Sequence, residues 1–149
     1  MSTINIAEIQ ISYSPTISKQ QRIKVTKSEE AYKVFLNSWN FDLIELQEEF
    51  KILLLNNANE VLGIHSLCRG TTNGVNVDLK LLFSIVLKTC ATSIIVAHNH
   101  PSGNLNASQS DKDLTIKIKK SGELLDIKLL DHLIVTKEGF CSFSNKGFM

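Results

Sequence analysis

Residues 93–103, Ser-Ile-Ile-Val-Ala-His-Asn-His-Pro-Ser-Gly, join an apolar run to a pair of histidines. The run over residues 93–97 is typical of a strand in the centre of a sheet, where both faces are buried. His98 and His100 extend this strand, and Pro101 and Gly103 end it at once. Side chains two residues apart on a strand point to the same side, about 6–7 Å apart along the chain. The pattern therefore predicts two neighbouring imidazoles at the mouth of a sheet.

A hairpin and a helix are expected before this stretch. Apolar runs over residues 50–55 and 61–67 flank a turn formed by residues 56–59, which predicts a β-hairpin. Asp78 can cap the helix that follows. The apolar residues of that helix recur at helical spacing: Leu79, Leu82, Phe83, Val86, Leu87 and Cys90.

The rest of the chain continues the alternation of helices and strands. A helix is expected over residues 108–121, with Gly122 as the glycine that ends it, followed by strands over residues 127–135 and 140–143. Ser28 is expected to cap an earlier amphipathic helix. One face of that helix carries Ala31, Tyr32, Phe35, Leu36 and Trp39. The pattern predicts an α/β fold, a mixed β-sheet flanked by helices, in one domain over residues 28–149.

Residues 1–27 are expected to form an N-terminal arm. Ile9, Ile11 and Tyr13 alternate with polar residues, which indicates a short edge strand or a segment that docks on another surface. Pro15 and the polar residues after it favour a loose connection to the domain.

The composition limits the classes of function. The 149 residues carry a net charge of +1, which gives no strong nucleic-acid signal. No segment approaches the ~18 consecutive apolar residues of a membrane span, and the N-terminus does not resemble a signal peptide. The three cysteines lack CxxC spacing, so neither a disulfide framework nor a zinc knuckle is indicated. We expect a cytoplasmic protein.

A catalytic zinc site needs a third protein ligand beside the histidine pair and an open position for water. Asp111 follows His100 by eleven residues, in the first turn of the next expected helix. Ser108 and Asp111 also form an S-x-x-D capping box, which alone would explain both residues. A lone HxH pair is often structural or incidental, so the residues by themselves leave both interpretations open.

The combined spacing carries a family resemblance. His98-x-His100, seven residues, and then Ser108-x-x-Asp111 resembles the signature of the JAMM/MPN⁺ metalloprotease superfamily. Within that group, the HNHPSGN motif and the later LLDHLIV motif are similar to bacterial RadC-like JAB domains. The resemblance covers residues 45–143 and implies a three-layer architecture like that of cytidine deaminases.

The resemblance also implies roles for individual residues. His98, His100 and Asp111 would be ligands of one Zn²⁺ ion. Glu48 would be the general base, because the family shows Glu-x-Phe before this strand; the neighbouring Glu49 is the alternative, and only one of the two can face the ion. Ser108 would stabilise the oxyanion.

The implied activity is that of a metallopeptidase-like hydrolase that cleaves a peptide or isopeptide-like amide bond through a zinc-activated water. Its partner would be a peptide or protein substrate. An accessory module associated with DNA repair, with a structural or vestigial metal site, is the alternative. Asp131 and His132 are candidates for a shell around the metal, although a packed histidine is the default interpretation of His132.

Overall fold

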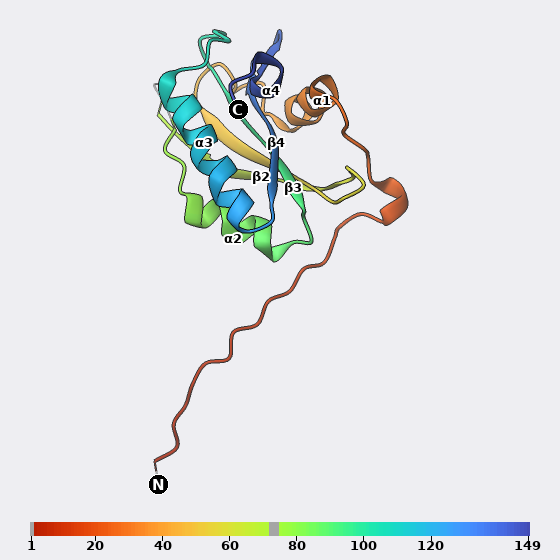
Figure 1. Ribbon diagram of the computed structural model, residues 1–149, viewed down its shortest axis with the longest axis vertical. Helices are drawn as coiled ribbons and strands as arrows, with labels where there is room; N and C mark the ends of the chain where they lie inside the picture. The colour runs from red at the N-terminus through yellow and green to blue at the C-terminus, as the bar shows by residue number, and fades with distance from the viewer. Residues whose placement is uncertain (1, 72–74) are drawn as a thin grey trace.

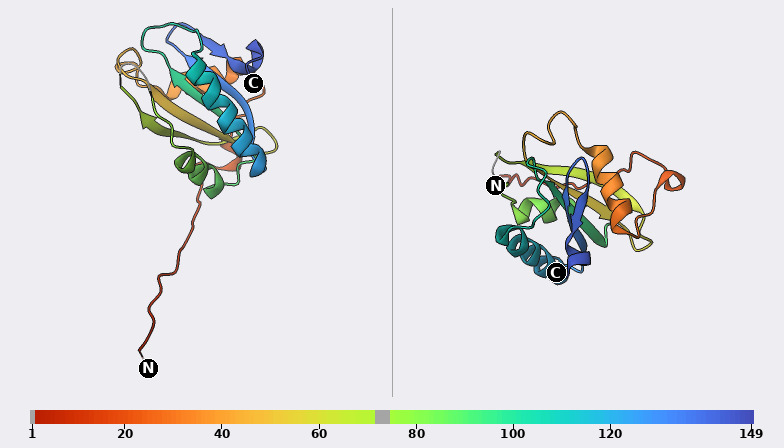
Figure 2. Two further views of the ribbon diagram at one scale, coloured as in Figure 1. Left: turned by 60° about the vertical axis from the view of Figure 1, so that its left-hand side comes forward. Right: turned by 90° about the horizontal axis from the view of Figure 1, so that it is seen from above.

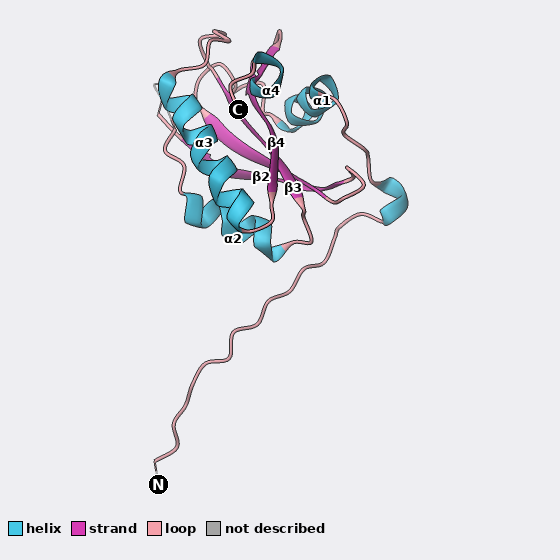
Figure 3. Cartoon of the chain, viewed as in Figure 1, coloured by secondary structure: helices cyan, strands magenta, loops and turns pink. Residues whose placement is uncertain are grey.

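The computed structural model describes residues 2–71 and 75–149, which form a mixed sheet with helices on both sides (Figure 1). The helices are the short 3-10 helix η1 Lys19–Gln21, α1 Ser28–Ser38, α2 Leu79–Lys88, α3 Gln109–Leu124 and α4 Phe143–Lys146. The strands are β1 Glu49–Leu55, β2 Val61–Arg69, β3 Ser93–Asn99, β4 Lys128–Val135 and β5 Phe140–Ser142. Figure 3 distinguishes the helices from the strands by colour.

The five strands have the order β2-β1-β3-β4-β5. The predicted hairpin is confirmed, because β1 pairs antiparallel with β2, and β1 also pairs antiparallel with β3. β3 and β4 are parallel and α3 connects them, whereas β4 and β5 are antiparallel. The α/β class and the mixed sheet are thus confirmed, and every residue of β1 and β3 is buried at the centre.

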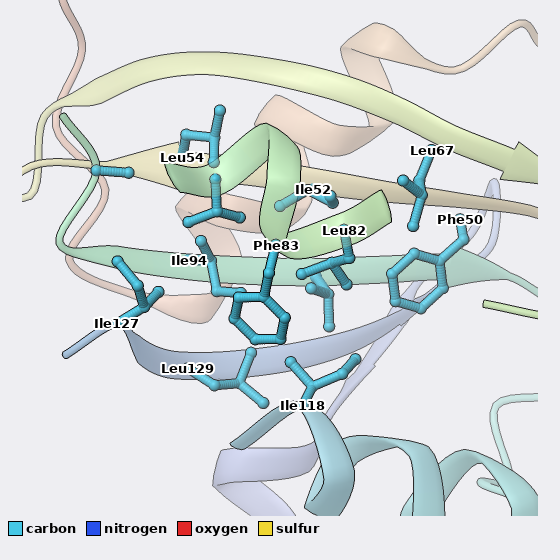
Figure 4. Packing of buried hydrophobic residues seen from close by; sticks show 13 residues of the cluster. Phe50, Ile52, Leu54, Leu67, Leu82, Phe83, Ile94, Ile118, Ile127 and Leu129 are labelled. Atoms are coloured by element: carbon cyan, nitrogen blue, oxygen red, sulfur yellow. The ribbon is translucent and has the colours of Figure 1, made fainter. Parts of the chain in front are cut away.

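Helices cover both faces of the sheet, which gives three layers (Figure 2). α2 and α3 pack on one face, where Figure 4 shows the largest hydrophobic cluster. That core includes Phe50, Ile52, Leu82, Phe83, Ile94, Ile118 and Leu129. α1 packs on the other face, over a core that includes Phe35, Trp39, Leu53, Leu55, Ile95 and Leu133. Burial of this apolar surface is the main term that holds the layers together.

The helix ends agree with the sequence in part. Asp78 caps α2 as predicted, since its carboxylate accepts the N–H groups of Lys80 and Leu81. The prediction for Ser28 is wrong. Lys27 holds the N-cap position, and the carboxylate of Glu30 accepts the N–H groups of Thr26 and Lys27 instead, 2.7 and 3.2 Å away.

Gly122 does not end its helix. α3 continues to Leu124, and the left-handed residue that follows is Asp126, with a φ of 57°. A Cβ atom at Gly122 would lie 2.4 Å from the carbonyl oxygen of Ile127, far inside van der Waals contact. The glycine is therefore required by close packing of the chain after α3, a non-local reason.

The last expected strand is shorter than predicted. β5 ends at Ser142, whose side chain caps the short helix α4 by accepting the N–H of Asn145, so Phe143 is helical. None of the helices in the part of the chain that the structure describes has the length and apolar content to span a bilayer.

The N-terminal arm extends away from the body of the molecule (Figure 1). Residues 9–13 form no strand here, and Ile9 and Ile11 are 86% and 77% exposed. A segment becomes a strand only by hydrogen-bonding to a neighbouring strand, and no described strand lies beside this one. Contact with the domain begins near Lys24, which bridges to Glu60. The boundary between residues 27 and 28 and the docking of the arm stay predictions.

Candidate metal centre

The carboxyl end of β3 brings together the three predicted ligands. His98 and His100 lie on the same side, and their Nε2 atoms are 3.0 Å apart. The carboxylate of Asp111 reaches both rings, with Oδ1 3.4 Å from Nε2 of His98 and Oδ2 3.6 Å from Nε2 of His100. Within the described residues, this is the group of His, Cys, Asp and Glu side chains that could hold a metal ion.

The loop after β3 explains how Asp111 returns to the histidines. Gly103 has a φ of +78°, and its N–H donates to the carbonyl oxygen of His100. The chain then turns back to Ser108, whose hydroxyl accepts the N–H of Asp111, while Oδ2 of Asp111 accepts the N–H of Ser108. The capping box is thus real, and its carboxylate also faces the two imidazoles.

The spacing of the donor atoms fits a small tetrahedral cation. Ligand atoms about 2.0–2.1 Å from a tetrahedral zinc lie about 3.4 Å from one another. The separations of 3.0, 3.4 and 3.6 Å lie around that value. Two imidazole nitrogens with one carboxylate oxygen are a donor set suited to zinc, whereas magnesium and calcium prefer oxygen ligands.

The ionisation of Asp111 also suits a ligand. Burial raises the pKa of its carboxyl group, but hydrogen bonds with His100 and His98 outweigh burial and hold that pKa well below its usual range. The side chain is therefore a carboxylate at neutral pH, the form that binds cations.

Glu48 lies in the same cavity, which has a volume of about 440 Å³. The register of β1 and β3 pairs Phe50 with His98, and Glu48 and His100, just beyond these paired residues, both line the cavity. Burial raises the pKa of the Glu48 carboxyl, and the charge of Asp111 adds to this, against an opposing effect of the two histidines. A raised pKa suits a carboxyl group that takes up and returns a proton near neutral pH.

Glu49 points to the opposite face of the sheet. Its carboxylate accepts a hydrogen bond from Ser66 and lies 3.7 Å from Nζ of Lys51 and 3.9 Å from Nε of Arg69. Of the two candidate bases, only Glu48 lines the cavity of the histidines. Ser108 lies on the wall of the same cavity, at the N-terminus of α3.

Asn99 is a residue of the site whose role the sequence analysis did not identify. Asn99 stands between the two histidines in the sequence, but its side chain is fully buried and faces away from them. Its Oδ1 accepts the N–H of Glu49 at 2.7 Å, and its Nδ2 donates to the carbonyl oxygens of Ile44 and Gln47 at 2.7 and 2.9 Å. Asn99 thereby fixes the segment that carries Glu48. An asparagine on a buried strand was the available signal, because a buried amide needs partners.

His132 and Asp131, the two candidates for a surrounding shell, have different positions. Nε2 of His132 lies 2.8 Å from Nδ1 of His98, so this histidine contacts a predicted ligand. Asp131 points elsewhere and accepts hydrogen bonds from the hydroxyl of Ser142 and the N–H of Ser144. Adjacent residues on β4 face opposite sides of the sheet, so both could not reach the cluster.

The family model and the similar known proteins that we compared agree on one family. The RadC-like JAB domain family matches residues 25–148. A UPF0758 protein from Flavobacterium johnsoniae is 45% identical over 125 residues, which cover 83% of this chain and 53% of that protein. UPF0758 proteins from Staphylococcus haemolyticus and Porphyromonas gingivalis are each 34% identical, over 86% and 91% of this chain and 55% and 59% of their own lengths.

The chain therefore spans little more than half the length of these relatives. The matched region contains the whole ligand cluster, the candidate base and both central strands. The family match extends over most of the chain, and the sheet with its helices is the fold expected of a JAB domain. The chain belongs to the RadC-like JAB domain family.

Proposed function

We propose that this domain is a zinc-dependent hydrolase that cleaves an amide bond in a peptide or an isopeptide-like linkage. One observation carries the proposal: three side chains able to hold zinc share a solvent-accessible cavity with a carboxyl group of raised pKa. His98, His100 and Asp111 would hold the ion. Three protein ligands leave a tetrahedral cation one open position, which is the mark of a catalytic site.

Each side chain has a defined task in such a reaction. A bound zinc ion supplies Lewis acidity that lowers the pKa of water to about 7 and polarises the substrate carbonyl. The carboxylate of Glu48 accepts a proton from water as the water oxygen bonds to the carbonyl carbon. Glu48 then returns that proton to the nitrogen, so that the C–N bond breaks and a neutral amine leaves. The hydroxyl of Ser108 donates a hydrogen bond to the oxygen on which negative charge develops.

The first test is the zinc content of the purified chain after zinc loading and dialysis. Elemental analysis should give one zinc per chain, and His100→Ala should lose it. His65→Ala is a matched control, because His65 is exposed on β2 and lies outside the cluster. A wild-type chain that retains no zinc would contradict the proposal.

The second test is hydrolysis of a complex peptide mixture, followed by mass spectrometry of the new termini. Zinc-loaded wild type should generate new termini, and Glu48→Gln should retain zinc without generating them. Salt-sensitive DNA binding by a zinc-loaded chain without any hydrolysis would instead favour an accessory module that acts with DNA.

A further inference from the structure

We infer that Thr115 and His132 form a hydrogen-bond relay that sets the tautomer of His98 and so points a bare Nε2 nitrogen at the metal position. The inference deepens the proposed function and rests on its ligand assignment. Neither residue touches the cavity, so both are positioning residues that act through His98.

Three short contacts make up the relay. Oγ1 of Thr115 lies 2.7 Å from the carbonyl oxygen of Asp111 and 2.6 Å from Nδ1 of His132. Nε2 of His132 lies 2.8 Å from Nδ1 of His98. Each distance is that of a hydrogen bond, so each pair of atoms must share one proton.

The direction of the relay follows from the only group in it that cannot donate. A carbonyl oxygen only accepts, so the hydroxyl proton of Thr115 points to Asp111. Oγ1 of Thr115 then accepts the Nδ1–H of His132, which leaves Nε2 of His132 bare if that ring is neutral. The bare nitrogen accepts the Nδ1–H of His98, and the remaining nitrogen of His98, Nε2, faces the cluster without a proton.

The reverse direction conflicts with the contact between Thr115 and Asp111. If Thr115 donated to His132, two oxygen acceptors would face each other at 2.7 Å with no proton between them. The reversed relay would also place a proton on Nε2 of His98, and a protonated nitrogen cannot bind a cation. Nδ1 of His100 lies 2.5 Å from the carbonyl oxygen of Asn104 and must donate to it, so a neutral His100 also has a bare Nε2. In the inferred direction both Nε2 atoms therefore lack a proton, and the space between them suits a cation.

The surroundings of His132 keep the relay intact. The ring is fully buried, stacked on Phe143 with a centroid distance of 4.5 Å, and it meets Phe50 edge-on at 5.8 Å. The two nitrogens of the ring contact the hydroxyl of Thr115 and the imidazole of His98, neither of which is an anion. A buried charge is costly without an opposite charge in contact, so this environment favours the neutral ring. The contacts of His132 with Thr115 and with His98 are both buried, so water does not compete for them.

The relay also joins two of the three ligands. Thr115 follows Asp111 by one helical turn of α3, whereas His98 lies on β3. His132 on β4 lies between them. The position of the Asp111 backbone and the proton of His98 are therefore set by one chain of contacts.

Zinc affinity tests the relay, with a chelator of known affinity as competitor. Thr115→Val preserves the shape of the side chain but removes the acceptor for His132, and His132→Leu removes the acceptor for His98. Each should weaken zinc binding by about 10–100-fold, the usual effect of losing a partner of a metal-bound histidine. Thr115→Ser restores the hydroxyl and should restore affinity, and His132→Gln should recover part of it through its amide oxygen.

Ser84→Ala is the matched control for Thr115→Val. The hydroxyl of Ser84 also donates to a carbonyl of its own helix, that of Leu81 in α2, but it lies far from the cluster in sequence and on an exposed face. Affinity in Ser84→Ala should equal that of the wild type. If Thr115→Val weakens zinc binding no more than Ser84→Ala, the relay is wrong.

A second measurement does not depend on zinc. Long-range ¹H–¹⁵N correlation spectra of the metal-free chain distinguish the two tautomers of a neutral imidazole, and His132 should carry its proton on Nδ1. A proton on Nε2 would overturn the relay even in a chain that binds zinc. The predicted tautomer in a wild-type chain that binds no zinc would support the relay arrangement and reject the proposed function, so the two failures are distinguishable.

Discussion

Where β1 begins and β3 ends, the two faces of the sheet carry polar side chains with different roles. On the face of the cavity, Glu48, His98 and His100 line one solvent-accessible hollow, and the two imidazoles face each other. On the opposite face, Glu49 and Asn99 are buried and bind other groups of the chain itself. These residues are immediate neighbours in sequence, and the alternation of a strand alone separates them.

The difference shows that neighbouring residues of one short segment can form the candidate site and hold that site in position. Asn99 makes two hydrogen bonds to the segment before β1, at Ile44 and Gln47, and one to Glu49, the first residue of β1. Glu48 lies between these contacts. The hidden face therefore fixes where the cavity face presents its carboxyl group. If this division is correct, substitutions on one face should change chemistry and substitutions on the other should change stability.

The largest effect is expected for hydrolysis by Glu48→Gln. The amide cannot accept the proton of water, so the rate should fall by about 10²–10⁴-fold, the usual contribution of a general base. Glu49→Gln should retain the rate to within a few fold, because that side chain faces away from the cavity. Rates on one cleaved peptide, measured at equal zinc occupancy, decide this. If Glu49→Gln loses more of the hydrolysis rate than Glu48→Gln, Glu49 is the general base and the two faces do not differ in the way described.

The next largest effect is the loss of stability in Asn99→Ala. The substitution removes the partner of the buried N–H of Glu49, of the buried carbonyl of Ile44 and of the partly buried carbonyl of Gln47. We expect the free energy of unfolding to fall by about 3 kcal/mol, since each orphaned buried group costs about 1–3 kcal/mol and the site can relax. Urea unfolding measures the change, with Asn57→Ala in an exposed turn as the control. Equal midpoints for the two variants would show that Asn99 supports nothing.

Much of the cavity face could be predicted from local sequence. The i, i+2 spacing of His98 and His100 fixes their common side, and the capping position of Asp111 fixes the direction of its carboxylate. Both depend on backbone geometry over a few residues, so periodicity suffices. The choice of Glu48 came from the family pattern, and the register with β3 explains it.

The hidden face could not be predicted in this way, because its partners are distant in sequence. Asn99 binds residues fifty or more positions away, and Gly122 is required by the approach of a later carbonyl rather than by its own helix. The arm shows the same limit: alternation at Ile9 and Ile11 indicates a strand, but a strand needs a neighbour to pair with. Contacts of this kind form only when the layers of the fold pack together, so local sequence patterns do not predict them.

A smaller effect is expected for the stability of Glu49→Gln. The substitution leaves the ammonium group of Lys51, whose side chain is only 8% exposed, without its nearby carboxylate. Lys51 retains its hydrogen bond to the carbonyl oxygen of Ser38, which limits the cost. A loss of about 2 kcal/mol is expected, below the 3–5 kcal/mol typical of a fully buried pair. Thermal unfolding of the metal-free chain measures it, and a variant as stable as the wild type would mean that the ion pair contributes nothing.

The smallest effect, opposite in sign, is expected for the stability of metal-free Glu48→Gln. Burial raises the pKa of Glu48 in the folded chain, so folding disfavours the ionised form. The contribution of Glu48 to the free energy of unfolding is fully present below the pKa of the unfolded chain, about 4.3. It is lost as pH rises through the higher pKa of the folded chain. Glutamine cannot ionise and does not incur this loss. At pH 7 the variant should therefore be more stable by less than about 1 kcal/mol after solvent screening, and the gain should vanish near pH 4.

Unfolding midpoints of both chains from pH 4 to 8, in the presence of a chelator, give the comparison. A destabilised variant at pH 7 would place Glu48 among the supporting residues, together with Glu49, and the two faces would no longer differ in kind.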